Sequence, residues 1–366
     1  MTKWNKDDFN IVMNKIKGFS PSGLEKLEKE NGVVTFPKFE GVDAIDTKEN
    51  SHDILSAYIE DGYKEIRNEA FNESLLENIR VPDSLETIGS EAFRYTDIEE
   101  FNFGENLKFI GKDAFSSTDL KNVDLSKTKL KAISPSLFSC SSLIETVKFP
   151  DTITAIGNEA FRALSHLKEV TIPKSVETIG EGAFRDSGIE RVTLEDGSKL
   201  NTIGSSAFDT ETLQEINLEK AGFLEYIGFW AFYGVNLSSL KIETNAESLV
   251  IGTNAFKNSF IVNASIISNG ENMAIYSGAF EGTALQKAYF KAKEIYFLFE
   301  SCARSWIYDL KIESELCNLQ QRVFANNNLI KCDIKGLKRV PLNAFENNPK
   351  LNISFSDDVE LVEEEF

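Results

Sequence analysis

The sequence predicts a solenoid, in which short coils of chain stack on one another, and two observations support this prediction. First, an Ala-Phe pair or a close variant recurs with steps of 22 to 24 residues. Second, the stretches "FPDTITAIGNEAF" (149–161) and "IPKSVETIGEGAF" (172–184) repeat one pattern of apolar residues and glycine. The regularly spaced phenylalanines are Phe71, Phe93, Phe115, Phe138, Phe161, Phe184, Phe208, Phe232, Phe256 and Phe280, followed less regularly by Phe324 and Phe345.

Each repeat begins with a short predicted strand. In "LKEVTIPKSVETIGEGAF" (167–184), Val170 and Ile172 alternate with polar residues, so both side chains face the core. Pro173 ends the strand because proline has no backbone N–H to donate. Coil-on-coil stacking then aligns these strands into a parallel sheet.

The second half of the repeat returns the chain to the core. Val176 and Ile179 lie at helical spacing, and we expect a short helical or turn segment here. We expect Gly180 to adopt a backbone conformation that a Cβ would oppose. The ring of Phe184 should fill the space between coils and contribute roughly 1.5–3 kcal/mol through its burial.

Composition limits the possible partners. The net charge is −19 and the pI is near 4.7, which argues against nucleic acid and against general adhesion to anionic membranes. The sequence contains no apolar run of 18 residues, and its first residues do not have the pattern of a signal peptide. We therefore expect either a cytoplasmic protein or a chain whose signal was removed.

The cysteine spacing does not indicate a metal site. Cys140, Cys302, Cys317 and Cys332 form no C-x-x-C pair and have no neighbouring histidine. Cys140 and Cys332 fall at inward repeat positions, so we expect both to be buried. The sequence leaves open whether Cys302 and Cys317 form a disulfide.

No catalytic constellation is expected. The only histidines are His52 and His166, and no phosphate-binding loop or EF-hand spacing occurs. We expect no catalytic residue, no metal site and no cofactor, and we predict that the protein is not an enzyme.

Two domains are expected. Residues 1–32 form an N-terminal cap, with a helix over Ser22–Asn31 whose Leu24 and Leu27 dock on the first coil. Residues 33–366 form about 13 coils, with an irregular part at 285–320. The chain ends within a repeat, which is consistent either with a degenerate acidic cap or with a natural chain that continues.

The irregular part is rich in aromatic and basic residues. Its sequence permits two interpretations: a contact surface, or a decayed repeat that refills its core with large rings. Its aromatic residues are Tyr289, Phe290, Tyr296, Phe297, Phe299, Trp306 and Tyr308, and its lysines are Lys287, Lys291, Lys293 and Lys311.

The pattern L-x-x-I-x-I-P-x-x-V-x-x-I-G-x-x-A-F resembles the BspA-like leucine-rich repeat family of bacterial and protozoan surface proteins. The resemblance covers roughly residues 33–366. It implies a right-handed leucine-rich repeat solenoid, with a parallel sheet on one face and short strands, turns and short helical segments on the other. It also implies an extracellular or surface-attached adhesion module that binds host or neighbouring-cell proteins, with no catalytic residues.

Outward strand positions form two rows of polar side chains, and a broad protein partner suits them better than a small molecule does. In one repeat these positions are Glu100 and Asn102. Carbohydrate is weakly supported, because only Tyr289 offers an exposed ring on this face. An intracellular scaffold or assembly protein is the alternative function. The candidate ligand-binding residues are Arg191, Lys241, Lys287, Tyr289, Tyr308 and Lys311.

Overall fold

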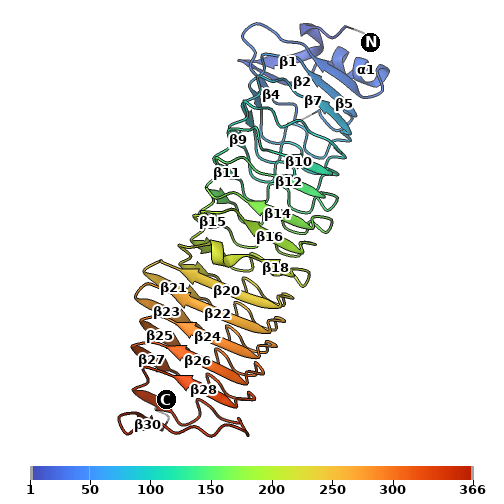
Figure 1. The fold of residues 1–366 in the computed structure, drawn as a ribbon. Coiled ribbons are helices and arrows are strands. Elements are labelled where there is room, and N and C mark those ends of the chain that lie inside the picture. Colours follow the sequence, from blue (N-terminus) through green and yellow to red (C-terminus); the bar gives the residue numbers. More distant parts are fainter. Residues whose placement is uncertain (1–2, 49, 364–366) are drawn as a thin grey trace. The chain divides into compact units, whose positions relative to one another are not determined.

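The computed structural model describes residues 3–48 and 50–363 and has the predicted fold class, a parallel β-solenoid of about 14 turns with little helix (Figure 1). The chain divides into two compact units. Unit 1 comprises Met1–Val170 with Asp186–Gly188, and unit 2 comprises Thr171–Arg185 with Ile189–Phe366. Strand β14 (Glu169–Ile172) lies where the sequence passes from one to the other.

Most coils contain two short strands, one more than we predicted. In the repeat quoted above, β14 is the predicted strand, and β15 (Thr178–Ile179) forms where we expected helical spacing. The second strand shows no recognisable alternation of polar and apolar residues in the sequence, because it is only two residues long. The strands therefore fall into two sets. We call the set that contains β14 the strand face, and the set that contains β15 the Thr-Ile ladder.

The family resemblance implied short helical segments, but the chain around the Ala-Phe pairs forms turns. Glu69 and Glu73, two residues on either side of Phe71, both have positive φ, 58° and 56°. A right-handed helix cannot contain such residues. The N–H of Phe71 instead donates to the Ala92 carbonyl of the next coil (2.8 Å). In the described residues, helix is confined to α1 and two 3-10 turns.

In unit 1, the strand face has an interruption. β3, β5 and β7 pair in parallel, and so do β10 and β12, but residues 97–103 between them form no strand. The strand-face strands are β3 (Val33–Phe36), β5 (Ser56–Ile59), β7 (Asn78–Arg80), β10 (Asn122–Asp124) and β12 (Thr146–Lys148). The Thr-Ile ladder contains β4 (Ala44–Ile45), β6 (Glu65–Ile66), β8 (Thr87–Ile88), β9 (Phe109–Ile110), β11 (Ala132–Ile133) and β13 (Ala155–Ile156).

In unit 2, the strands from β20 to β28 span four to six residues, and most of the earlier ones span two. The strand face contains β16 (Arg191–Leu194), β18 (Glu215–Ile216), β20 (Ser239–Thr244), β22 (Asn263–Ser268), β24 (Lys287–Lys291), β26 (Asp309–Glu313) and β28 (Lys331–Ile334). The Thr-Ile ladder contains β15, β17 (Thr202–Ile203), β19 (Tyr226–Ile227), β21 (Ser248–Ile251), β23 (Asn272–Ile275), β25 (Glu294–Phe297) and β27 (Leu316–Leu319). A 3-10 turn η2 (Leu218–Lys220) and strands β29 (Arg339–Pro341) and β30 (Glu360–Val362) complete the unit.

The repeated phenylalanines form the core, as predicted. All ten of the regularly spaced rings are fully buried. Neighbouring rings stack almost in parallel: the centroids of Phe71 and Phe93 are 5.4 Å apart at 4°, and those of Phe232 and Phe256 are 5.0 Å apart at 3°. The prediction that coils cover each other's rings is confirmed within each unit.

The stretch 285–320 is a decayed repeat that refills its core. Cys302 takes the place of the stacked ring, because its N–H donates to the next coil (Val323 O, 3.0 Å) as that of Phe280 does to Ser301 O (2.7 Å). Two rings from strand positions fill the space. The centroid of Phe290 lies 6.1 Å from that of Phe280 and 5.1 Å from that of Phe297, which in turn is 5.3 Å from Phe324. These rings supply the ring-to-ring contact that Cys302 lacks.

The repeat glycines are needed for close approach, which corrects our expectation about their conformation. A Cβ on Gly111 would lie 2.3 Å from Ser90 N, and one on Gly228 would lie 2.5 Å from Ser205 N, although neither has positive φ. Real Cβ atoms do not approach the backbone of a neighbouring coil so closely.

A buried hydroxyl three residues after many of the rings satisfies the carbonyl of the phenylalanine. Thr96, Thr118 and Thr283 are buried, and each donates its hydroxyl to the preceding Phe carbonyl at 2.8, 3.1 and 2.9 Å. The Phe115 and Phe280 carbonyls also accept from the hydroxyls of Ser141 and Ser305 in the following coil, so these buried carbonyls are satisfied by side chains.

The N-terminal segment contains more than the predicted helix. After a 3-10 turn (Lys6–Asp8), β1 (Phe9–Val12) and β2 (Lys15–Phe19) form an antiparallel hairpin, and β2 pairs in parallel with β4. Helix α1 (Pro21–Lys29) follows, with Ser20 as its N-cap. Leu27 is buried as expected, but Leu24 is 42% exposed, so docking by Leu24 was a wrong prediction.

All four cysteines are free thiols in the structure, so Cys302 and Cys317 do not pair. Burial of Cys140 was predicted wrongly. It is exposed, because it lies two residues after Phe138 at a turn position with φ of 63°. Cys332 points inward on β28 but is only half-buried. The incomplete repeat expected from Phe355 ends at residues 364–366, which lie outside the described residues.

Candidate functional site

The strand face of unit 2 presents the two predicted rows of outward side chains. Along β20, β22, β24 and β26, Lys241, Ser265, Tyr289 and Lys311 lie in register, one per strand. In the parallel row, Lys287 lies opposite Asn263 and Asp309. Adjacent strands are about 4.8 Å apart, so Lys287, Tyr289 and Lys311 lie side by side.

Tyr289 and Lys311 share a carboxylate partner. The Tyr289 hydroxyl donates to Glu313 Oε2 (3.0 Å), Lys311 Nζ lies 2.6 Å from Glu313 Oε1, and the ammonium lies 5.3 Å from the Tyr289 ring centroid. The hydrogen bond from Lys311 lowers the pKa of Glu313, and the same bond raises the pKa of Lys311. The pKa of Tyr289 is raised by burial and by Glu313. All three are therefore in their usual charge states near neutral pH.

The other predicted residues are more dispersed. Arg191 lies on β16 and forms an ion pair with Glu215 (2.9 Å) on β18. Lys241 lies on β20, two strands from Tyr289. Tyr308 precedes β26 and lines a shallow pocket of about 270 Å³ with Trp306, Gln286, Asn328 and Ala284. Trp306, which is 64% exposed, was not among our candidates. The structure thus brings three of the six candidates together.

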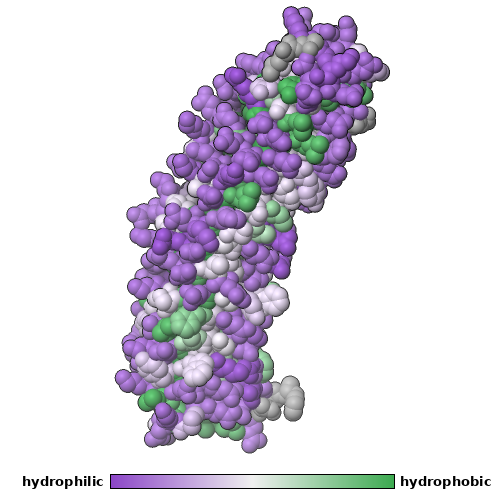
Figure 2. Space-filling model, turned by 90° about the vertical axis from the view of Figure 1, so that its right-hand side faces the viewer, coloured by the Kyte–Doolittle hydropathy of each residue, from purple (hydrophilic) through white to green (hydrophobic). Residues whose placement is uncertain are grey.

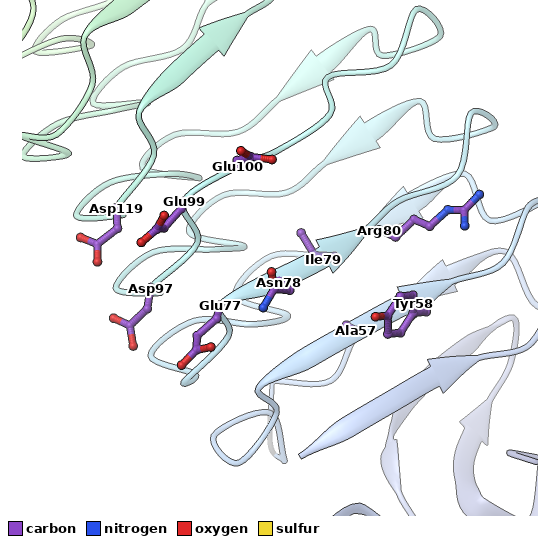
Figure 3. A pocket seen from close by; sticks show the side chains of 10 residues that line it. All are labelled: Ala57, Tyr58, Glu77, Asn78, Ile79, Arg80, Asp97, Glu99, Glu100 and Asp119. Carbon is purple, nitrogen blue, oxygen red and sulfur yellow. The ribbon is translucent and has the colours of Figure 1, made fainter. Parts of the chain in front are cut away.

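A second site, which the sequence did not predict, lies in unit 1 beside the interruption of the strand face. We name it the β7 groove. It comprises two adjoining hollows, of about 580 and 540 Å³, which share Tyr58, Ile79 and Arg80. Figure 3 shows the first hollow, where the carboxylates of Glu77, Asp97, Glu99 and Asp119 gather at one end and Arg80 lies at the other.

Two buried phenylalanines lie where the strand face is interrupted. We predicted Glu100 and Asn102 as outward strand positions; both are exposed, but they belong to no strand. Between them and just after, Phe101 and Phe103 are buried among the core rings. Phe101 lies 5.3 Å from Phe93 of the β7 coil and 4.8 Å from Phe115 of its own coil. Phe103 lies 6.1 Å from Phe138 of the next coil.

The β7 groove is strongly acidic. Five carboxylates line the first hollow and three line the second, against one guanidinium, that of Arg80. Of the five, only Glu99 has an ion pair within the part of the chain that the structure describes, with Lys121 Nζ at 2.6 Å. The sequence carried a signal that we missed: Asp97 and Asp119 share one repeat position, four residues after the ring. Stacking places such residues beside each other.

Hydrophilic side chains dominate the side of the molecule shown in Figure 2, and apolar ones form small separate groups. None of the helices in residues 3–48 and 50–363 has the length and apolar character that crossing a bilayer requires. Across the same residues, no group of three or more His, Cys, Asp and Glu side chains is arranged to hold a metal ion.

The two-strand coil, the stacked rings and the polar outer rows define a leucine-rich repeat solenoid. The chain belongs to the family described as the BspA type leucine rich repeat region, which matches residues 64–187, 132–263 and 225–352 with six copies. The resemblance seen in the sequence is thereby confirmed. A comparison with curated proteins gave no match.

This chain is similar to several solved structures. A leucine-rich repeat protein from Bacteroides ovatus is 18% identical, with a TM-score of 0.56 over 99% of this chain and 97% of that one. A leucine rich cell surface protein from Faecalibacterium prausnitzii is 18% identical, with a TM-score of 0.45 over 99% and 95%. The pneumococcal vaccine antigen PcpA is 16% identical, with a TM-score of 0.42 over 98% and 93%. At these identities the likeness concerns the fold alone.

Proposed function

We propose that the protein is a non-enzymatic binding module that contacts host or neighbouring-cell proteins through its strand face. The observation that carries the proposal is the in-register alignment of one outward polar side chain per strand along β20 to β28. Lys241, Lys311 and Asp333 in this row are exposed, and Ser265 and Tyr289 are half-buried. A series of such side chains on a stacked scaffold supports a broad protein contact, because the strands fix their spacing.

Within this face, Lys287, Tyr289 and Lys311 are the residues we expect to contribute most. Tyrosine is enriched among the residues that dominate binding energy, and the two neighbouring ammonium groups place positive charge beside it. Glu313 holds both Tyr289 and Lys311 in place, so little side-chain freedom is lost on binding.

The test is a pull-down of surface and extracellular-matrix proteins with the full chain and with the triple variant Lys287→Ala, Tyr289→Ala, Lys311→Ala. The matched control is Lys174→Ala, Lys199→Ala, Tyr276→Ala, which removes the same residue types from exposed positions off this face. We expect loss of a partner only in the first variant. Equal retention of every partner by both variants would contradict the proposed contact region.

We further propose a cell-surface or secreted location, which rests on the family resemblance. Four free cysteines instead favour the second candidate, an intracellular scaffold, since secreted proteins commonly pair their cysteines. Protease treatment of intact cells that express the natural gene decides between the two. Digestion of the protein in unbroken cells supports the surface location, and protection until lysis supports the scaffold.

A further inference from the structure

We propose that the β7 groove binds an extended segment of a partner protein that carries Lys or Arg residues at both ends. This inference rests on the proposed function, because it names a partner class for a protein-binding module. It assigns the contact to unit 1 and therefore to a surface separate from the candidates on β20 to β28.

One edge of strand β7 is open. β7 pairs with β5 on one side through Asn78, Ile79 and Arg80. On its other side, no backbone-to-backbone hydrogen bond joins residues 77–83 to residues 96–106 in the part of the chain that the structure describes. The side-chain amide of Asn106 donates to Asp83 O (3.1 Å), three residues beyond the end of β7. In the next coil the equivalent position is bonded, because Lys121 N donates to Glu99 O (3.2 Å). An open edge of this kind is a template for another strand.

The β7 groove has room for a peptide segment. The two hollows lie along β7 from Glu77 to Asp83, and each has a volume within the range of ligand sites. At about 3.3 Å per residue, this length suits an extended segment of about seven residues. Ile79, half-buried at the centre, offers an apolar contact for its middle.

The charges along the β7 groove are unevenly distributed. Glu77, Asp97 and Asp119 lie at the start of the groove, and Glu60, Asp61 and Asp83 lie at its end. The centre holds Arg80, so the negative potential is strongest at both ends. A segment with cationic ends and a neutral middle matches this distribution, and an acidic or neutral segment does not.

The experiment uses the full chain and a blocked heptapeptide, Lys-Lys-Val-Thr-Val-Lys-Lys, with affinity measured by fluorescence anisotropy of a labelled copy. The groove variant is Glu77→Gln, Asp97→Asn, Asp119→Asn. The control variant is Glu211→Gln, Glu225→Gln, Glu247→Gln, which changes net charge equally at exposed positions of unit 2. A second peptide has alternate backbone nitrogens methylated and keeps all side chains. Thermal melts followed by circular dichroism check that both variants are folded.

We expect the heptapeptide to bind, the groove variant to bind it about tenfold more weakly, and the control variant to remain within about twofold. The methylated peptide should also lose about tenfold, because it cannot pair with β7. Equal losses in the two variants, full binding of the methylated peptide, or no binding to the wild type would overturn the proposal. Self-association of the wild type that the groove variant lacks, without peptide binding, would overturn it in favour of a second copy.

Failure of this experiment is distinguishable from failure of the proposed function. If the peptide does not bind but the Lys287, Tyr289, Lys311 variant loses a partner, the binding module stands and only the β7 groove is excluded. If the peptide binds and that variant loses nothing, the contact region on unit 2 is excluded instead.

Discussion

Removal of one ring from the phenylalanine stack tests the physical basis of the fold. Phe232 is fully buried in unit 2, between Phe208 at 5.2 Å and Phe256 at 5.0 Å, with interplanar angles of 14° and 3°. Phe232→Ala leaves a cavity between coils whose strands hold them apart, so the cavity cannot close fully.

The magnitude follows from these contacts. Loss of the buried side chain costs about 1.5–3 kcal/mol by transfer alone. Each ring pair adds about 0.5–1.5 kcal/mol, and Phe232 takes part in two. The sum is consistent with the roughly 3–5 kcal/mol typical of Phe→Ala substitutions in cores.

The assay is urea denaturation followed by circular dichroism, with Phe229→Ala as the control. Phe229 is three residues away and 39% exposed, and its ring stacks on Trp230 at 4.3 Å. We expect Phe229→Ala to lower the free energy of unfolding by at most about 1 kcal/mol. If Phe232→Ala costs no more than Phe229→Ala, the stacked rings are not what stabilises the coils, and our reasoning is refuted.

Three further predictions follow from the core and its ion pairs. Cys302→Phe restores the repeat pattern but should destabilise the protein by about 1–3 kcal/mol in urea denaturation, because two other rings already occupy that space; a stabilised variant would contradict this. Thr96→Val should cost about 1–3 kcal/mol, since the buried Phe93 carbonyl loses the hydroxyl that donates to it, whereas an unchanged midpoint would show that the bond is dispensable. Burial opposes ionisation of Glu281, but hydrogen bonds from Lys257 and Arg304 outweigh it and hold its pKa below the ordinary 4.5. The stabilisation is therefore present above pH 4.5 and is lost as pH falls through the lowered pKa, so Glu281→Gln should flatten the pH dependence of the thermal midpoint in that acidic window; an unchanged slope would contradict the role of the pair.

The sequence was informative wherever one residue type recurs at the same position of successive repeats. The ring at Phe184 and its equivalents, the inward Val170 and Ile172, and the outward row through Tyr289 could all be read from spacing. Each of these positions faces the same environment in most coils, so the period alone assigns it to the core or to the surface.

The positions of single residues that interrupt the pattern could be determined only from the structure. Cys140 looked like a core residue until the positive φ at that turn position placed it outside. The two-residue strand β15 is too short for a period to reveal. The replacement of one ring at Cys302 by Phe290 and Phe297 depends on contacts between coils that no linear spacing encodes.

By itself, then, the sequence determined the class of fold, the stacked core and the exposed rows, because these depend on local pattern repeated at a fixed interval. Only the tertiary structure decided that Phe101 and Phe103 are buried among the core rings without forming a strand, and that β7 keeps an open edge beside a cluster of carboxylates. The physical reason is that a gap between neighbouring coils arises from how bulky side chains share space across repeats, and this is a property of the packed chain rather than of any one repeat.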